Sequence, residues 1–255
     1  MKIALIGTGN VATHIANRII ELNLDLFGVL GSSTVKTQLF SEKTGIKALK
    51  DYSELSKADL AIVCVQDNKL ETTLKETLEF CNCVTTSGTF DITRLPKMNF
   101  EAGVFYPLQS FAADTEVDFS KIPFFIEAAD RLFEKELLQL GNQLGKEAVI
   151  FNASDRINLH ITAVFLNNFS NHICALGNEF AQSKGIDFSW FEALIDETFR
   201  KIKRGASFKD QTGPAQRGDT ETMQKHLQLL DEMKAKIYST ISESIQQKNQ
   251  THDQL

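Results

Sequence analysis

No block of lysine or arginine occurs in the 255-residue sequence, and the formal net charge is −6. Nucleic acid and anionic membrane surfaces are bound through basic patches, so neither partner is predicted. No apolar run approaches the roughly 18 residues that span a bilayer, and residues 1–10 lack the basic start of a secretion signal. The sequence therefore predicts a cytoplasmic protein.

Cysteine is scarce as well, with four residues at scattered positions. Cys81 and Cys83 lie two apart, but no second Cys or His pair accompanies them at zinc spacing, so no metal site is predicted. On a strand both side chains would point the same way. We therefore expect reduced thiols in a packed strand.

Short apolar runs alternate with helical patterns in the first part of the chain. Strands are predicted at residues 3–6, 26–30, 60–65, 83–86, 104–106, 123–127 and 148–151, with a candidate short strand at 47–49. Helices are predicted at about 10–22, 38–43, 68–79 and 131–144, and residues 111–121 form a loop. The alternation up to residue 86 predicts an α/β fold with a doubly wound, parallel sheet.

The strand pattern stops after Asn152. Helices are predicted at residues 155–184, 188–203 and about 220–247. We place a domain boundary here, between an α/β domain at residues 1–152 and an all-helical domain at residues 153–255.

The turn after the first strand carries the strongest motif, Gly7-Thr8-Gly9-Asn10-Val11-Ala12. Gly7 permits a tight turn, Gly9 leaves no side chain between the backbone and a pyrophosphate, and Ala12 lets the helix pack close to the sheet. The N-terminus of that helix attracts anions. The motif predicts a Rossmann domain whose residues Gly7, Thr8, Gly9, Asn10 and Val11 bind a dinucleotide. A structural turn without ligand is the alternative.

The end of the second strand indicates which dinucleotide is bound. Domains that prefer NAD place an Asp or Glu there for the ribose hydroxyls, but this chain has Gly31-Ser32-Ser33-Thr34 and then Lys36. Hydroxyls and a lysine suit a 2′-phosphate, so Ser32 and Ser33 favour NADP, with NAD possible. Ser33 as a cap of the next helix is the alternative.

Three more segments follow strands at the edge where such folds bind ligands. They contain Val65 and Gln66, then Ser87 and Gly88, then Gln109. Turn chemistry alone explains any one of them. Their coincidence at one edge predicts contacts with the cofactor and, for Gln109, with a substrate.

The long predicted helix carries His160, Asn167, Asn171 and Asn178 on one stripe, opposite an apolar face. We expect a buried or cleft-facing polar seam, which serves a substrate, a subunit interface or internal hydrogen bonds. Between two later helices, Arg217 has the planar fork suited to a carboxylate or phosphate. Its alternatives are pairing with Asp219 or capping a helix.

Taken together, the glycine turn, Ser87-Gly88, residues 105–111, His160 with Asn167-Asn168-Phe169, and Thr212-Gly213-Pro214 with Arg217 resemble one bacterial family. Its members are provisionally named NADP oxidoreductases, and they join a Rossmann-like domain to a helical domain of unknown function. By fold the family is similar to pyrroline-5-carboxylate reductases, prephenate dehydrogenases and β-hydroxyacid dehydrogenases. The resemblance implies a homodimer formed by the helical domains and a substrate cleft between the domains.

This chain differs from the related proteins at two places that bear on function. Related members often have an arginine where Ser32 stands, and hydroxyacid dehydrogenases carry a Lys–Asn pair where this chain has His160 and Val164. The first hypothesis is an NAD(P)-dependent oxidoreductase for a small anionic molecule: His160 transfers the proton, Asn167 or Asn171 orients the substrate, and Arg217 binds an acidic group. The second is a dinucleotide-binding sensor or scaffold without catalysis.

Overall fold

The computed structural model describes residues 1–113 and 115–252, the last four of these without side chains. It divides into two compact units, Met1–Leu166 and Asn167–Leu255. The domain boundary predicted at residue 152 lies inside the first unit, immediately before helix α5.

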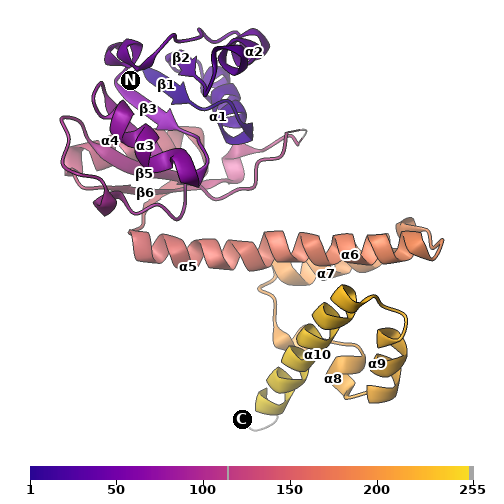
Figure 1. Cartoon of the computed structure of the whole chain (residues 1–255). Coiled ribbons are helices and arrows are strands. Elements are labelled where there is room, and N and C mark those ends of the chain that lie inside the picture. Colours follow the sequence, from indigo (N-terminus) through magenta and orange to yellow (C-terminus); the bar gives the residue numbers. More distant parts are fainter. Residues whose placement is uncertain (114, 253–255) are drawn as a thin grey trace. The chain divides into compact units, whose positions relative to one another are not determined.

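The first unit is built on one seven-stranded sheet (Figure 1). Its strands are β1 (Ile3–Ile6), β2 (Leu26–Leu30), β3 (Leu60–Val63), β4 (Asn82–Thr85), β5 (Ala102–Pro107), β6 (Pro123–Ala128) and β7 (Glu147–Ile150). The spatial order is β2-β1-β3-β4-β5-β6-β7. Ile6 is level with Leu30 and with Val63, so the loops after β1, β2 and β3 start at one edge of the sheet.

The parallel sheet predicted from the order of elements up to residue 86 is confirmed, and beyond β5 the sheet becomes mixed. Strands β1 to β5 are parallel, but β6 runs antiparallel to β5, and β7 is parallel to β6. A parallel connection needs a long crossover, usually a helix. The segment between β5 and β6 has only a short 3₁₀ turn at Phe119–Lys121 in its described part, so the chain turns back beside β5.

Helices cover both faces of the sheet. They are α1 (Asn10–Glu21), α2 (Thr34–Thr44), α3 (Asp67–Thr77) and α4 (Arg131–Leu144). Successive residues of a strand face opposite sides. Ile3 and Leu5 therefore pack in the cluster with α1, α2 and α4, whereas Ala4 and Ile6 pack in the cluster with α3. A buried leucine or isoleucine side chain such as Leu5 or Ile6 contributes about 1.5–3 kcal/mol to folding.

The candidate strand at residues 47–49 is reduced to a single bridge between Ala48 and Val29. Leu49 fills the space beside Gly28, where an added Cβ would lie 2.5 Å from a Leu49 methyl carbon. The segment therefore seals the edge of the sheet beside β2 without forming a strand of its own.

The remaining helices are α5 (Ala153–Ala163), α6 (Ser170–Ser183), α7 (Glu192–Lys203), α8 (Pro214–Arg217), α9 (Thr220–Leu227) and α10 (Glu232–His252). The helix predicted over 155–184 contains a π-helical segment, Val164–Phe169, between α5 and α6. The helix predicted over 220–247 is two helices, because the Asp231 carboxylate accepts from the Lys234 amide and starts α10. None of the described helices has both the length and the apolar character that a bilayer crossing requires.

Candidate functional site

The glycine turn joins the carboxyl ends of three strands. Gly7 has φ +116°, and a Cβ at this position would lie 2.3 Å from the Cys64 carbonyl oxygen. The Gly7 amide donates to Leu30 O at 2.8 Å, and the Cys64 amide donates to Ile6 O at 2.7 Å. Gly7 is therefore required both by its left-handed backbone and by the closeness of β3.

A cavity of about 590 Å³ lies over this turn. Seven predicted cofactor residues line it: Gly7, Thr8, Gly9, Asn10, Ser32, Val65 and Gln66. At Gly9 an added Cβ would meet nothing within 4 Å, so the space above the start of α1 is open. Four predicted cofactor residues are not among its lining: Val11, Ser33, Ser87 and Gly88. Val11 packs against the core, and Ser33 caps α2 by accepting from the Lys36 amide.

Three lysines line the same cavity: Lys36, Lys43 and Lys69. Lys36 and Lys43 are two helical turns apart on one face of α2, and Lys69 lies in the first turn of α3. This concentration of positive charge, in a chain of net charge −6, suits phosphate groups. Lys43 was not predicted as a site residue, although its spacing of seven residues from Lys36 indicates that both lie on the same face of one helix. Lys69 could not be found in this way, because it reaches the cavity only through the packing of α3 on the sheet.

Cys64 lines the cavity, but its thiol is not a nucleophile. Burial raises the pKa of Cys64 to about 12, and a hydrogen bond with Thr86 offsets this only in part. The thiol therefore stays protonated at neutral pH. Cys64 contributes to the site through its backbone carbonyl, which lies against Gly7.

The loop after β4 forms a second group of candidate residues with Tyr106 and His160. A Cβ on Gly88 would lie 2.8 Å from the Tyr106 ring, so the loop backbone rests directly on that ring. The His160 ring meets Tyr106 edge-on, with ring centroids 6.4 Å apart. His160 Nδ1 is buried and has no hydrogen-bond partner within the described part of the chain. Burial raises the pKa of Tyr106, which keeps its phenol neutral.

Gln109 follows β5 at the same edge of the sheet. Its side chain is exposed, and its Oε1 accepts from the Ser110 amide at 2.8 Å. The neighbouring loop is tied to α1, because Asn10 Nδ2 donates to Phe111 O and the His14 ring contacts Ala112 O. Gln109 is thus held near the start of α1 by its own loop.

The other predicted residues belong to the second unit. Asn167 and Asn171 are exposed in the single chain, whereas the buried Oδ1 of Asn178 has no partner among the described residues. Arg217 ends α8 and is exposed. Hydrogen bonds from Thr222, and to a smaller extent the charge of Arg217, lower the pKa of Asp219. Asp219 itself caps α9.

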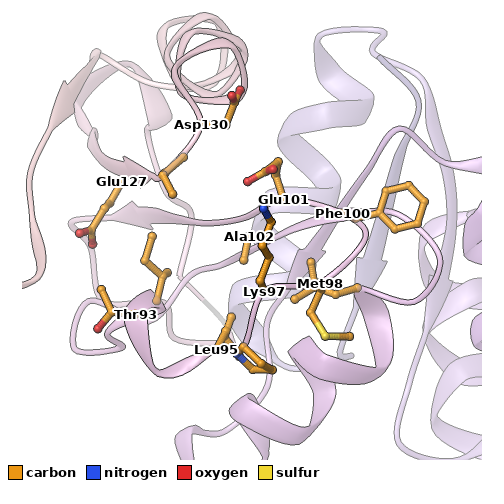
Figure 2. Close-up of a pocket in the computed structure, with 14 residues that line it drawn as sticks. Thr93, Leu95, Lys97, Met98, Phe100, Glu101, Ala102, Glu127 and Asp130 are labelled. Atoms are coloured by element: carbon orange, nitrogen blue, oxygen red, sulfur yellow. The ribbon is translucent and has the colours of Figure 1, made fainter.

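A further cavity of about 620 Å³ lies at the opposite edge of the sheet, where β5 starts and β6 ends. Figure 2 shows Glu101, Glu127 and Asp130 in its wall, above an apolar floor with Leu95 and Met98. None of the predicted site residues lines it. Its carboxylates disfavour the phosphates of a dinucleotide, so the cavity over the glycine turn is the better candidate.

Comparison with known proteins agrees with this geometry. Residues 2–80 match the family described as "NADP oxidoreductase coenzyme F420-dependent", and residues 122–245 match a domain of unknown function, DUF2520. A search of curated proteins finds no match.

Solved structures give similar results. A protein of Bacteroides fragilis, provisionally named an NADP oxidoreductase, is 31% identical over 96% of this chain and 98% of its own, with a TM-score of 0.87. An imine reductase of Myxococcus stipitatus in complex with NADP⁺ is 14% identical over 100% and 94% of the two chains, at 0.65. Pyrroline carboxylate reductase of Plasmodium falciparum with NADP bound is 14% identical over 98% of each chain, at 0.60. The last two show a shared fold. The chain belongs to the NADP oxidoreductase family represented by the Bacteroides protein.

Proposed function

We propose that the protein is an NADPH-dependent reductase of a small, anionic C=N or C=O compound. The observation that carries the proposal is the cavity over the glycine turn, whose wall combines an open helix N-terminus with three lysines. The names of the similar structures, an imine reductase and a pyrroline carboxylate reductase, support a C=N substrate. The non-enzymatic alternative is not favoured by membership in an oxidoreductase family.

In this proposal the two ends of NADPH meet different parts of the first unit. The pyrophosphate binds at Gly9 and Asn10, where α1 begins and its amides are unpaired. Lys36 and Lys43, beside Ser32, hold the 2′-phosphate. When bound, the nicotinamide supplies a hydride to the unsaturated carbon of the substrate. Ser87 and Gly88 lie on the adjacent strand end and border that ring.

The proton needed by the substrate nitrogen or oxygen comes from His160. Its ring lies against Tyr106, and Tyr106 in turn supports the loop of Gly88. The neutral Tyr106 phenol is a hydrogen-bond donor that orients the substrate. Asn167, Asn171, Gln109 and Arg217 are proposed substrate contacts, with Arg217 pairing with the anionic group.

The test begins with binding. NADPH fluorescence titration is expected to give micromolar affinity, and NADH to bind at least tenfold more weakly. Cyclic imines, keto acids and hydroxy acids are then screened for turnover. His160→Asn is expected to lower kcat by about 10²–10⁴ while the affinity for NADPH is retained. Tight NADPH binding without turnover on any compound, and no effect of His160→Asn, would favour the sensor instead.

We also propose that the protein is a homodimer formed through its helices. Ile157, Ile161, Phe165, Phe169 and Ile173 follow one another at intervals of four residues, and each is 42–62% exposed. In an α-helix such a row drifts around the axis, because a turn takes 3.6 residues. The wider π-helical turns at Val164–Phe169 counter this drift, so the apolar row stays on one side of the helix. An exposed apolar row of this length is typical of a subunit interface.

A further inference from the structure

Arg156 is a buried cation that the proposed chemistry does not use. It lies in the first turn of α5, and its side chain has no exposed surface. Removing a guanidinium from water costs several kcal/mol even when it is paired, so such an ion pair is a poor way to gain stability alone. A buried cation at this position calls for another explanation.

The guanidinium joins three separate segments of the first unit. Its Nη1 donates to the Glu127 carboxylate on β6 and to Phe151 O at 2.9 Å, and its Nη2 donates to Phe90 O at 2.6 Å. Phe90 ends the loop that contains Ser87 and Gly88. Arg156 therefore holds the backbone of that loop, the end of strand β6 and the start of α5 together.

The contacts of Arg156 also fix where His160 lies. Glu127 pairs with Val104 on β5, and Tyr106 is two residues further along the same strand. Two strand residues advance about 6.8 Å, and the four helix residues from Arg156 to His160 advance about 6 Å. Once Arg156 contacts Glu127, the next turn of α5 therefore brings the His160 ring to Tyr106, as observed.

We propose that Arg156 is a positioning residue that sets the register of α5 against β5 and holds the 86–90 loop, so that Gly88, Tyr106 and His160 form one site. The part of this proposal that concerns the nicotinamide rests on the proposed function. The register itself is a property of the apoprotein.

Two variants test this role. Arg156→Lys keeps the buried charge but cannot reach Glu127, Phe151 O and Phe90 O together, since it lacks the planar fork. Glu127→Gln keeps an acceptor for Nη1 and is expected to have a smaller effect. Arg18→Lys is the matched control: Arg18 Nε donates to Leu144 O at 2.9 Å with the side chain 16% exposed, away from the site. Thermal melts establish that each variant is folded.

The first measurement needs no cofactor. In ¹H–¹³C spectra the His160 ring signals, assigned with His160→Asn, carry the ring-current shift of Tyr106. We expect Arg156→Lys to move these signals, and deuterium exchange of residues 86–92 to rise about tenfold, whereas Arg18→Lys changes neither. A folded Arg156→Lys protein with unchanged His160 signals and unchanged exchange would overturn the proposal.

The second measurement separates the two ends of the cofactor. Adenosine 2′,5′-bisphosphate occupies only the lysine side of the cavity, so its affinity is expected to stay within about twofold in Arg156→Lys. The affinity for NADPH is expected to fall about tenfold, because the loop beside the nicotinamide is released. Equal weakening of both ligands would contradict a positioning role. Failure of the wild-type protein to bind NADPH would count against the proposed function, and the spectra would still decide the role of Arg156.

Discussion

The absence of a side chain at Gly88 allows the Tyr106 ring to lie against the loop backbone. An added methyl group would lie 2.8 Å from the Tyr106 ring, and the ring would have to move. We expect Gly88→Ala to fold with a modest loss of thermal stability, because the half-buried Tyr106 ring can shift more easily than backbone. Displacing Tyr106 also displaces its contact with His160, so kcat of the proposed reduction is expected to fall at least tenfold. Steady-state kinetics and a thermal melt check this, and a folded variant with wild-type kcat would show that Tyr106 needs no fixed place.

We expect the four cysteines to differ in reactivity because they differ in burial. Burial raises the pKa of Cys64 to about 12 and of Cys81 to about 11, and it raises that of Cys83 well above its usual value. Cys174 alone is exposed. Since the thiolate is the reactive form, we expect a disulfide reagent at about pH 8 to modify one thiol in the native protein and four in denaturant. Cys174→Ser is expected to abolish the fast phase; a second fast thiol would contradict the packed strand.

Residues that line the cavity could be named from the sequence where the cause is local. Gly7 and Gly9 were identified because a strand, a turn and a helix are consecutive in the chain, and Lys36 because it follows β2 directly. Tyr106 and Arg156 could not be identified in this way. Their importance depends on Gly88 and Phe90, which reach them only after β4, β5 and α5 have packed.

At the scale of elements, the proposed function makes helix α2 the part of the cavity that distinguishes NADPH from NADH, because its Lys36 and Lys43 line that cavity. We expect the double variant Lys36→Ala with Lys43→Ala to weaken NADPH binding by roughly 10- to 100-fold, since two charge-assisted contacts to the 2′-phosphate are lost. NADH, which has no 2′-phosphate, is expected to change by less than about threefold. Fluorescence titration at two salt concentrations measures both.

Lys97→Ala is the control for the lysine variant, because Lys97 lines the cavity at the opposite edge of the sheet (Figure 2). It removes one positive charge from the same unit, where the double variant removes two, without touching the proposed cofactor site. Equal weakening of NADPH and NADH by the α2 variant would mean that these lysines act on a phosphate that both cofactors share.

Element order was largely predictable from the sequence, and element geometry was not. The apolar runs gave the strands because buried parallel strands are apolar on both faces. The direction of β6 depends on the connection between β5 and β6. A loop was predicted there at residues 111–121, but the antiparallel direction of β6 that follows from a loop was not inferred. The π-helical segment at Val164–Phe169 leaves no trace in hydrophobic periodicity that we could separate from an α-helix.

At the scale of the whole molecule, the exposed apolar row at positions 157–173 leads to the last prediction. Ile161 and Phe165 lie in the exposed row and are 51% and 62% exposed. If the row is the subunit interface, a charge there is buried on association and disfavours it strongly. We expect Ile161→Asp to convert a dimer into a monomer in light scattering after gel filtration, at micromolar concentration.

Leu132 provides the matched control for this substitution. It is 71% exposed on α4, so it is as accessible as Ile161 but lies outside the row. Leu132→Asp is therefore expected to leave the dimer intact. Two outcomes would show that the row is not the interface. One is a wild-type protein that stays monomeric across the micromolar range, and the other is a Leu132→Asp variant that dissociates like Ile161→Asp. The apolar side chains at positions 157–173 would then require a different partner, because a surface row of this length is unfavourable in water unless something covers it.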